Sequence, residues 1–291
     1  MAAPPAEAHC AKAALSAEAH CAKAGPPAEA QWAKAGHTIA MTHAASSRAA
    51  DVRAWYAQTS DLAANPALVA RGRASLTPIE RDRFDRFRHD EDRLMFLLGR
   101  LMARLLVGRA LGIAPMAWRW REGTHGRPEI DDPHTTLRFN VAHSAGMVVC
   151  ALADGRDVGV DVEDRHRHTV DREIVPRYCA PAEVADIDAQ PAADWQNRFL
   201  LYWTLKEAYL KALGLGISVP LAEVSFTIDG DDARVAFLGS LAGADTRWSF
   251  HLTRPTDRHQ LAVAASRADG VVPLIDIAPL PVEWIAECLR S

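Results

Sequence analysis

The order of strand-like and helix-like segments is the feature of this sequence that most limits its fold. A strand pattern at 52–58 precedes helix patterns at 75–88 and 91–113, and further strand patterns follow them. Helix patterns then return at 169–190 and 194–213, and strand patterns close the chain. This order predicts two similar α+β lobes with mainly antiparallel sheets, and not a doubly wound parallel fold.

The later strand patterns are short and alternate in polarity. They cover 117–122, 137–144, 147–153 and 157–163 in the first half, and 224–229, 234–239, 247–253 and 259–266 in the second. No G-x-G-x-x-G or G-x-x-x-x-G-K-[ST] motif follows any of them. Dinucleotide-binding folds and phosphate loops therefore have no support.

The first 46 residues differ from the rest. An Ala-rich eleven-residue unit repeats three times, as PPAEAHCAKAA, LSAEAHCAKAG and PPAEAQWAKAG. We predict a low-complexity, disordered tail over 1–46, an N-terminal lobe over 47–156 and a C-terminal lobe over 157–291. Metal binding by the His-Cys pairs of the tail is a weaker alternative, because the third unit replaces His-Cys with Gln-Trp. The sequence does not tell whether the tail has a role or belongs to the natural translation product.

Composition excludes several protein classes. With 49% hydrophobic residues and 24% charged residues, the chain is typical of a soluble globular protein, and its net charge of −4 argues against a general nucleic-acid binder. It has no apolar run that could cross a membrane and no secretory signal pattern. The five cysteines are scattered and lack C-x-x-C spacing, which predicts a cytoplasmic protein without disulfides or structural zinc.

Two acids near the end of a strand pattern form the first candidate site. In V-G-V-D-V-E, residues 158–163, Asp161 and Glu163 point to one face of a strand, with valines behind them. Two carboxylates at this spacing repel each other unless a cation or solvent separates them. Oxygen ligands of this kind suit Mg²⁺, although a solvated strand end would show the same pattern.

A third acid, Glu207, lies in the helix pattern W-T-L-K-E-A-Y-L-K at 203–211, with Lys206 and Lys211 to either side. The spacing of Glu207 and Lys211 also fits a surface ion pair worth about 0.3–0.5 kcal/mol. The apolar neighbours instead place Glu207 at the boundary of the core, where charges usually have a partner. We therefore predict that the three carboxylates meet around a metal ion.

A third motif, F-N-V-A-H-S at 139–144, places His143 at the end of a strand. Small residues follow it and leave room for an anion, and Gly126-Arg127-Pro128 supplies a further cation upstream. A single histidine is more often structural than functional, so this motif alone identifies no site.

Together these motifs resemble the Sfp-type 4′-phosphopantetheinyl transferases. The signature of that family, G-[VI]-D-[VI]-E and later W-x-x-K-E-[AS]-x-x-K, reads G-V-D-V-E at 159–163 and W-T-L-K-E-A-Y-L-K at 203–211. Its F-N-[VIL]-S-H-S reads F-N-V-A-H-S, with Ala142 where serine is usual, and its Gly-Lys-Pro reads Gly126-Arg127-Pro128. The resemblance covers roughly residues 51–270.

The resemblance implies a pseudo-dimer of two similar α+β lobes with coenzyme A bound between them. Mg²⁺ would be held by the three carboxylates Asp161, Glu163 and Glu207. The phosphates would be contacted by basic side chains: Lys211 and Lys206 on the pyrophosphate, His143 and Arg127 on the 3′-phosphate, and Arg83 as a further contact. Ala142 removes one hydroxyl that could bind a phosphate.

The implied reaction transfers 4′-phosphopantetheine from coenzyme A to a serine of an apo acyl carrier or peptidyl carrier protein and releases 3′,5′-ADP. Mg²⁺ neutralises the pyrophosphate, and Lys211 helps to fix it in line. Glu207, or a metal-bound water that it holds, is our candidate for the base that takes the serine proton. Such carriers belong to fatty-acid, polyketide or nonribosomal peptide synthases, as in secondary metabolite biosynthesis, and the sequence does not say which. We expect a monomer.

The Arg- and His-rich segment 165–178 is a candidate docking surface for the carrier, with Val170, Ile174 and Val175 as apolar contacts; a solvated helix face is the alternative.

Two other functions compete with transfer. One is a family member that only binds coenzyme A. The other is a nucleic-acid binder, based on eight arginines between Arg81 and Arg109, although five interleaved acids and apolar periodicity argue against it.

Overall fold

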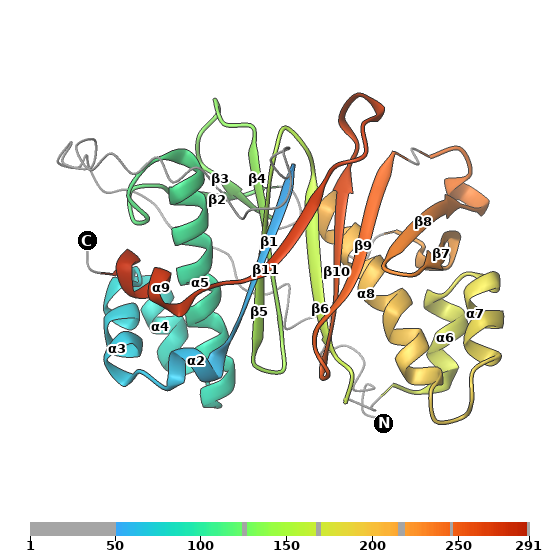
Figure 1. The fold of residues 1–291 in the computed structure, drawn as a ribbon, viewed down its shortest axis with the longest axis horizontal. Helices are drawn as coiled ribbons and strands as arrows, with labels where there is room; N and C mark the ends of the chain where they lie inside the picture. The colour runs from blue at the N-terminus through green and yellow to red at the C-terminus, as the bar shows by residue number, and fades with distance from the viewer. Residues whose placement is uncertain (1–50, 124–126, 167–169, 215–218, 245–246, 290–291) are drawn as a thin grey trace, which may run out of the picture.

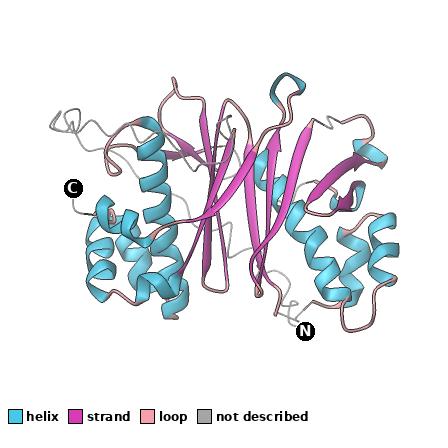
Figure 2. Cartoon of the chain, viewed as in Figure 1, coloured by secondary structure: helices cyan, strands magenta, loops and turns pink. Residues whose placement is uncertain are grey.

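The computed structural model describes residues 51–123, 127–166, 170–214, 219–244 and 247–289. The predicted tail at 1–46 lies outside these ranges. Two sheets stand in the middle of the molecule, and helices cover their outer sides (Figures 1 and 2). None of the helices in the described ranges combines the length and apolar character that crossing a membrane requires.

The first lobe begins with a strand and four helices: β1 (Val52–Gln58), α2 (Thr59–Ala63), α3 (Pro66–Ser75), α4 (Pro78–Arg86) and α5 (Asp90–Leu111). Its remaining strands are β2 (Trp120–Glu122), β3 (Pro128–Ile130), β4 (Leu137–Ser144) and β5 (Met147–Asp154). The second lobe repeats the order with β6 (Val158–Asp164), α6 (Val175–Tyr178), α7 (Pro181–Asp188), α8 (Trp195–Leu213), β7 (Val224–Asp229), β8 (Asp232–Phe237), β9 (Trp248–Thr256) and β10 (His259–Ser266).

The two lobes match in topology as well as in element order. The sheets have the orders β11-β1-β5-β4 and β6-β10-β9-β8-β7. In each lobe the first strand pairs antiparallel with the last, β1 with β5 and β6 with β10, and the preceding strand, β4 or β9, lies on the far side of that last strand. The long helices α5 and α8 cover the two sheets from outside (Figure 1). The predicted pseudo-dimer of α+β lobes is therefore confirmed.

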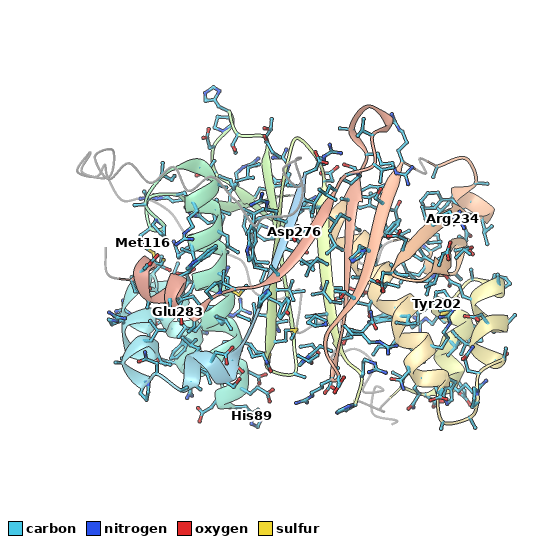
Figure 3. The ribbon with its side chains drawn as sticks, in the orientation of Figure 1. His89, Met116, Tyr202, Arg234, Asp276 and Glu283 are labelled. Carbon is cyan, nitrogen blue, oxygen red and sulfur yellow. The ribbon has the colours of Figure 1, made fainter. Side chains whose placement is uncertain are left out.

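The end of the chain returns to the first lobe. Strand β11 (Ile275–Pro279) pairs parallel with β1, and α9 (Val282–Cys288) packs beside α5. Figure 3 shows Asp276 of β11 over the middle of the molecule and Glu283 of α9 on the side of the first lobe. The lobes were predicted to cover 47–156 and 157–291. The last segment of the second range, β11 and α9, instead packs on the first lobe.

Local signals fix the ends of the main helices. Before α4, Thr77 Oγ1 accepts a hydrogen bond from the Glu80 amide, and Glu80 Oε2 accepts one from the Thr77 amide, so a capping box begins this helix. Helices α5 and α8 end at Gly112 and Gly214, whose φ angles of 69° and 67° are left-handed.

The lobes meet through an apolar core between the two sheets. Val158, Val160 and Val162 of β6 pack there against residues of β1, β5 and β10. The edge strands β4 and β6 lie next to each other, and Asn140 Oδ1 accepts a hydrogen bond of 2.9 Å from the Val160 amide. One face of β6 thus belongs to this interface, and the opposite face, with Asp161 and Glu163, is turned toward α8.

Gly159 allows α8 to lie directly on β6. A Cβ at this position would lie 2.1 Å from the carbonyl oxygen of Ala208 and 2.4 Å from the amide nitrogen of Ala212, both backbone atoms of α8. Since neither atom can move without the helix, only glycine fits at this position. This backbone contact fixes the position of α8 on β6.

We expect Gly159→Ala to lower the free energy of unfolding by more than about 3 kcal/mol, or to prevent folding, because the methyl group must push α8 off the sheet. Denaturant unfolding measures this. Gly99→Ala in α5 is the matched control: its Cβ would make an ordinary contact, 3.6 Å from Val141 Cγ1, and alanine favours the helix by under about 1 kcal/mol. Wild-type stability in Gly159→Ala would contradict the close contact.

Candidate active site

Asp161 and Lys211 join β6 to α8 at the centre of the candidate site. Asp161 is 4% exposed, and its Oδ1 accepts a hydrogen bond of 2.6 Å from Lys211 Nζ. Its Oδ2 is buried and has no hydrogen-bond partner. The alternation predicted for V-G-V-D-V-E is present, since Val160 and Val162 pack on the opposite face, between the lobes.

Glu163 is held by a tryptophan of the same helix. Trp203 Nε1 donates a hydrogen bond of 3.0 Å to Glu163 Oε1. The indole is fixed in turn by Phe199, with ring centroids 6.1 Å apart, and by Tyr178 at 5.3 Å. Trp203 was not among the predicted site residues, although its place four residues before Glu207 puts the two side chains on one stripe of the helix.

Glu207 completes a group of three acids around one lysine. Its Oε1 is buried without a hydrogen-bond partner. Burial, and then the charge of Asp161, raise the pKa of Glu207 to about 7 against the attraction of Lys211. Burial, and then Asp161 and Glu207, raise the pKa of Glu163 to about 8, and burial also raises that of Asp161. The structure thus brings the three predicted carboxylates together, at a place where their ionisation is disfavoured.

The donor set of this group fits a hard cation. Three carboxylates share the site, and Asp161 Oδ2 and Glu207 Oε1 are buried acceptors without partners. As the side chains stand, no three or more His, Cys, Asp or Glu residues in the described ranges form a metal centre. Lys211 is bonded to Asp161 instead. Burial works to lower the pKa of Lys211, but the charges of Asp161 and Glu207 outweigh it and raise that pKa.

His143 and Arg83 lie on the first-lobe side of the same site. His143 is exposed at the end of β4. The surrounding protein removes part of its hydration, and the nearby positive charge of Lys211 and then that of Arg83 act in the same direction, so its pKa is lowered. The Arg83 guanidinium is stacked over Phe96, 5.1 Å from the ring centroid. Lys211 and Arg83 therefore form a positive region around the neutral His143, beside the three acids.

Lys206 is not part of this site, and a contact between Lys206 and a pyrophosphate is incompatible with its position. The side chain is fully buried. Its Nζ forms a salt bridge of 2.8 Å with Glu183 Oε2 and donates hydrogen bonds to the carbonyl oxygens of Leu221 and Val224. Glu183 also accepts from the amides of Ala180 and Phe226. Lys206 fastens α8 to α7 and β7.

Arg127 and His143 are not brought together. The Arg127 guanidinium donates hydrogen bonds to the carbonyl oxygens of Ala212, at 2.6 Å, and Val158, at 3.4 Å. Both acceptors lie where β6 begins and α8 ends, whereas His143 lies beside Lys211 and Arg83. The expectation that the two side chains share one phosphate does not fit this placement. Arg127 connects the first lobe to the second.

Ala142 does not face the site either. It is 3% exposed and belongs to the apolar core between the lobes. A hydroxyl at this position would point into that core, because neighbouring residues of β4 alternate and His143 is the one that faces outward. Alanine in place of serine therefore costs the candidate site no contact.

Comparison with known proteins agrees with this arrangement. The model of the N-terminal domain of 4′-phosphopantetheinyl transferases matches residues 65–154, and that of the 4′-phosphopantetheinyl transferase superfamily matches 157–264. A phosphopantetheinyl transferase of Thraustochytrium sp. is 32% identical over 76% of this chain and 81% of its own length. The chain belongs to the 4′-phosphopantetheinyl transferase superfamily. The resemblance predicted from the sequence motifs is therefore confirmed.

Two further comparisons give lower sequence identity. The 4′-phosphopantetheinyl transferase of Bacillus subtilis is 28% identical over 67% of this chain and 84% of its own length. Among solved structures, the holo-[acyl-carrier-protein] synthase of Thermotoga maritima matches 38% of this chain and 62% of that chain, at 21% identity and a TM-score of 0.32.

The raised pKa values predict how the stability of the metal-free protein depends on pH. Folded Glu207 and Glu163 hold their protons up to about pH 7 and 8, whereas both release them near 4.5 when unfolded. The folded state binds more protons in this interval, so the free energy of unfolding should fall as pH rises from about 4.5 to 8. Glu207→Gln should flatten this slope by up to about 1.4 kcal/mol per pH unit below pH 7.

Urea unfolding in EDTA across this pH range tests the prediction. Glu173→Gln is the control, because Glu173 is an exposed acid outside the site, and it should keep the wild-type slope. A Glu207→Gln slope equal to that of the wild type would mean that Glu207 is ionised in the metal-free site.

Proposed function

We propose that this protein transfers 4′-phosphopantetheine from coenzyme A to a serine of an apo acyl carrier or peptidyl carrier protein and releases 3′,5′-ADP. The proposal rests on one observation: a member of this superfamily gathers three carboxylates, buried Asp161 and partly buried Glu163 and Glu207, around one lysine, beside a positive region at the junction of its lobes. The acids suit a cation, and the positive region suits the phosphates of coenzyme A.

Asp161, Glu163 and Glu207 would hold Mg²⁺, which when bound would neutralise the pyrophosphate and the leaving group. The buried, unpartnered oxygens of Asp161 and Glu207 support this assignment. Trp203 keeps one oxygen of Glu163 engaged and so fixes its orientation. Without a cation, burial raises the pKa of all three acids, and acids perturbed in this way are typical of functional sites.

Glu207 is our candidate for the base that accepts the proton of the carrier serine. As one of the three acids, it would lie where the cation and the serine hydroxyl meet, within reach of that proton directly or through a metal-bound water. Lys211, whose raised pKa keeps it charged, would exchange its bond to Asp161 for the pyrophosphate. His143 and Arg83 would contact the 3′-phosphate from the first lobe.

The surface next to Glu163 is our candidate for carrier docking. Arg165 lies in the turn that directly follows β6, two residues beyond Glu163. Partial burial and the nearby guanidinium of Arg254 both lower the pKa of Arg165, so two positive charges lie close together there. An acidic carrier would be attracted to them. The apolar contact predicted for Val175 is wrong, since this side chain is 2% exposed and belongs to the core of the second lobe.

Carriers of fatty-acid, polyketide or nonribosomal peptide synthases are the expected partners. We further propose that the protein acts as a monomer in the cytoplasm, because the two lobes within one chain already provide both sides of the site.

Intact-protein mass spectrometry tests the reaction directly. An apo carrier incubated with the protein, coenzyme A and Mg²⁺ should gain the mass of phosphopantetheine, and EDTA or Asp161→Ala should abolish the gain, because each removes part of the cation site. A gain that persists in Asp161→Ala would contradict the assigned metal site. No gain with acyl and peptidyl carriers, together with coenzyme A binding, would favour a protein that binds coenzyme A without transfer.

Charge reversal tests the docking surface. Arg165→Glu with Arg254→Glu should raise the KM for the carrier by about tenfold or more and leave the KM for coenzyme A unchanged, since both charges lie outside the phosphate region. The control is Arg234→Glu on β8, whose side chain is exposed on the outer side of the second lobe (Figure 3). Equal carrier KM values in the double variant and the control would rule this surface out.

A further inference from the structure

The turn that follows His143 has an unfavourable backbone conformation. Strands β4 and β5 are joined by two residues, Ala145 and Gly146, between the paired Ser144 and Met147. Their φ angles are 47° and 80°, so both are left-handed, as in a type I′ turn. Asn, Asp or Gly usually occupies the first position of such a turn. Ala145 is the one residue other than glycine with positive φ in the described ranges.

A buried histidine of the other lobe binds this turn. His259, at the start of β10, is 2% exposed, and its Nε2 lies 3.1 Å from the carbonyl oxygen of Ala145. Its Nδ1 lies 2.7 Å from Thr256 Oγ1. A hydroxyl that donates to Nδ1 leaves the proton on Nε2, which then donates to the Ala145 carbonyl. Burial lowers the pKa of His259, which favours this neutral form.

The first lobe holds the same turn from the opposite side. The Thr59 amide donates a hydrogen bond of 2.7 Å to the carbonyl oxygen of Gly146, and the Gly146 amide lies 3.4 Å from Met95 Sδ. The two residues of the turn are therefore fixed by both lobes. Since His143 lies two residues before Ala145, its direction depends on the turn.

We propose that His259 is a positioning residue that holds the β4–β5 turn in its left-handed form and thereby keeps His143 beside Lys211 and Arg83. That His143 binds a phosphate of coenzyme A rests on the proposed function. The hold of His259 on the turn does not. Loss of the bond from His259 leaves Ala145 to adopt positive φ unaided, which L-residues other than Asn, Asp and Gly disfavour. The turn then relaxes, and His143 leaves the positive region.

The test compares three substitutions. His259→Leu removes the donor and keeps an apolar side chain of similar size. His259→Gln keeps an N–H at a comparable reach and should restore the bond. Ala145→Gly removes the backbone penalty, so it should have little effect alone and should rescue His259→Leu. A purely structural role of His259 in the core would give no rescue by a change on the other lobe.

Two readouts are independent of each other. Hydrogen exchange at the amides of residues 143–147 should be at least about tenfold faster in His259→Leu than in the wild type, and close to wild type in His259→Gln and in the double variant. The KM for coenzyme A should rise by about tenfold in His259→Leu and fall back in the same two variants, while the KM for the carrier stays constant.

Unchanged exchange at 143–147 in His259→Leu, or a double variant that exchanges as fast as His259→Leu, would overturn the proposal. If the wild-type protein transfers nothing, the proposed function fails, but the exchange measurement still decides whether His259 holds the turn. If exchange behaves as expected and the KM for coenzyme A does not change, then His259 holds the turn and His143 does not bind coenzyme A, which overturns the positioning role.

Discussion

The contact between α8 and β6 is the constraint on which the rest of the site depends. Because Gly159 has no side chain, the backbone of the helix lies on the backbone of the strand, and the acids of β6 reach the same space as Glu207 and Lys211. The fully buried pair Lys206–Glu183 holds α8 from its other side. The two lysines of α8 thus have different roles. The pair Lys206–Glu183 fixes the position of the helix, and Lys211, paired with Asp161, lies in the candidate site.

Periodicity and motifs in the sequence were sufficient to predict the lobes, the long helices and the three carboxylates, because each of these depends on local spacing. Lys206 shows where such reasoning stops. Successive helix residues are about 100° apart, so Lys206 lies about a quarter turn from Glu207, whereas Lys211 lies only about 40° from it. Which of these directions is solvent and which is core depends on α7 and β7, and nothing in the local sequence indicates their positions.

For a related reason, Arg127 and Val175 were misjudged, and the elements α2, α3, β3, β11 and α9 were missed. Arg127 was expected to bind a phosphate and Val175 to contact the carrier, because the sequence does not show which residues are already engaged within the fold. In the structure, Arg127 donates a hydrogen bond to a carbonyl oxygen of the second lobe, and Val175 belongs to the core of that lobe. The missed elements are short, and weak periodicity gives little signal over so few residues. His259, separated from Ala145 by more than a hundred residues, has no local signal at all.

The return of β11 to the first sheet makes the two halves of this protein interdependent despite their repeated topology. A fragment cut between β5 and β6 would leave β1 with an open edge of unpaired backbone groups, because its parallel partner belongs to the other fragment. It would also uncover the surface of α5 that α9 occupies. The first lobe is therefore not a complete unit without the end of the chain, although the two lobes repeat one topology.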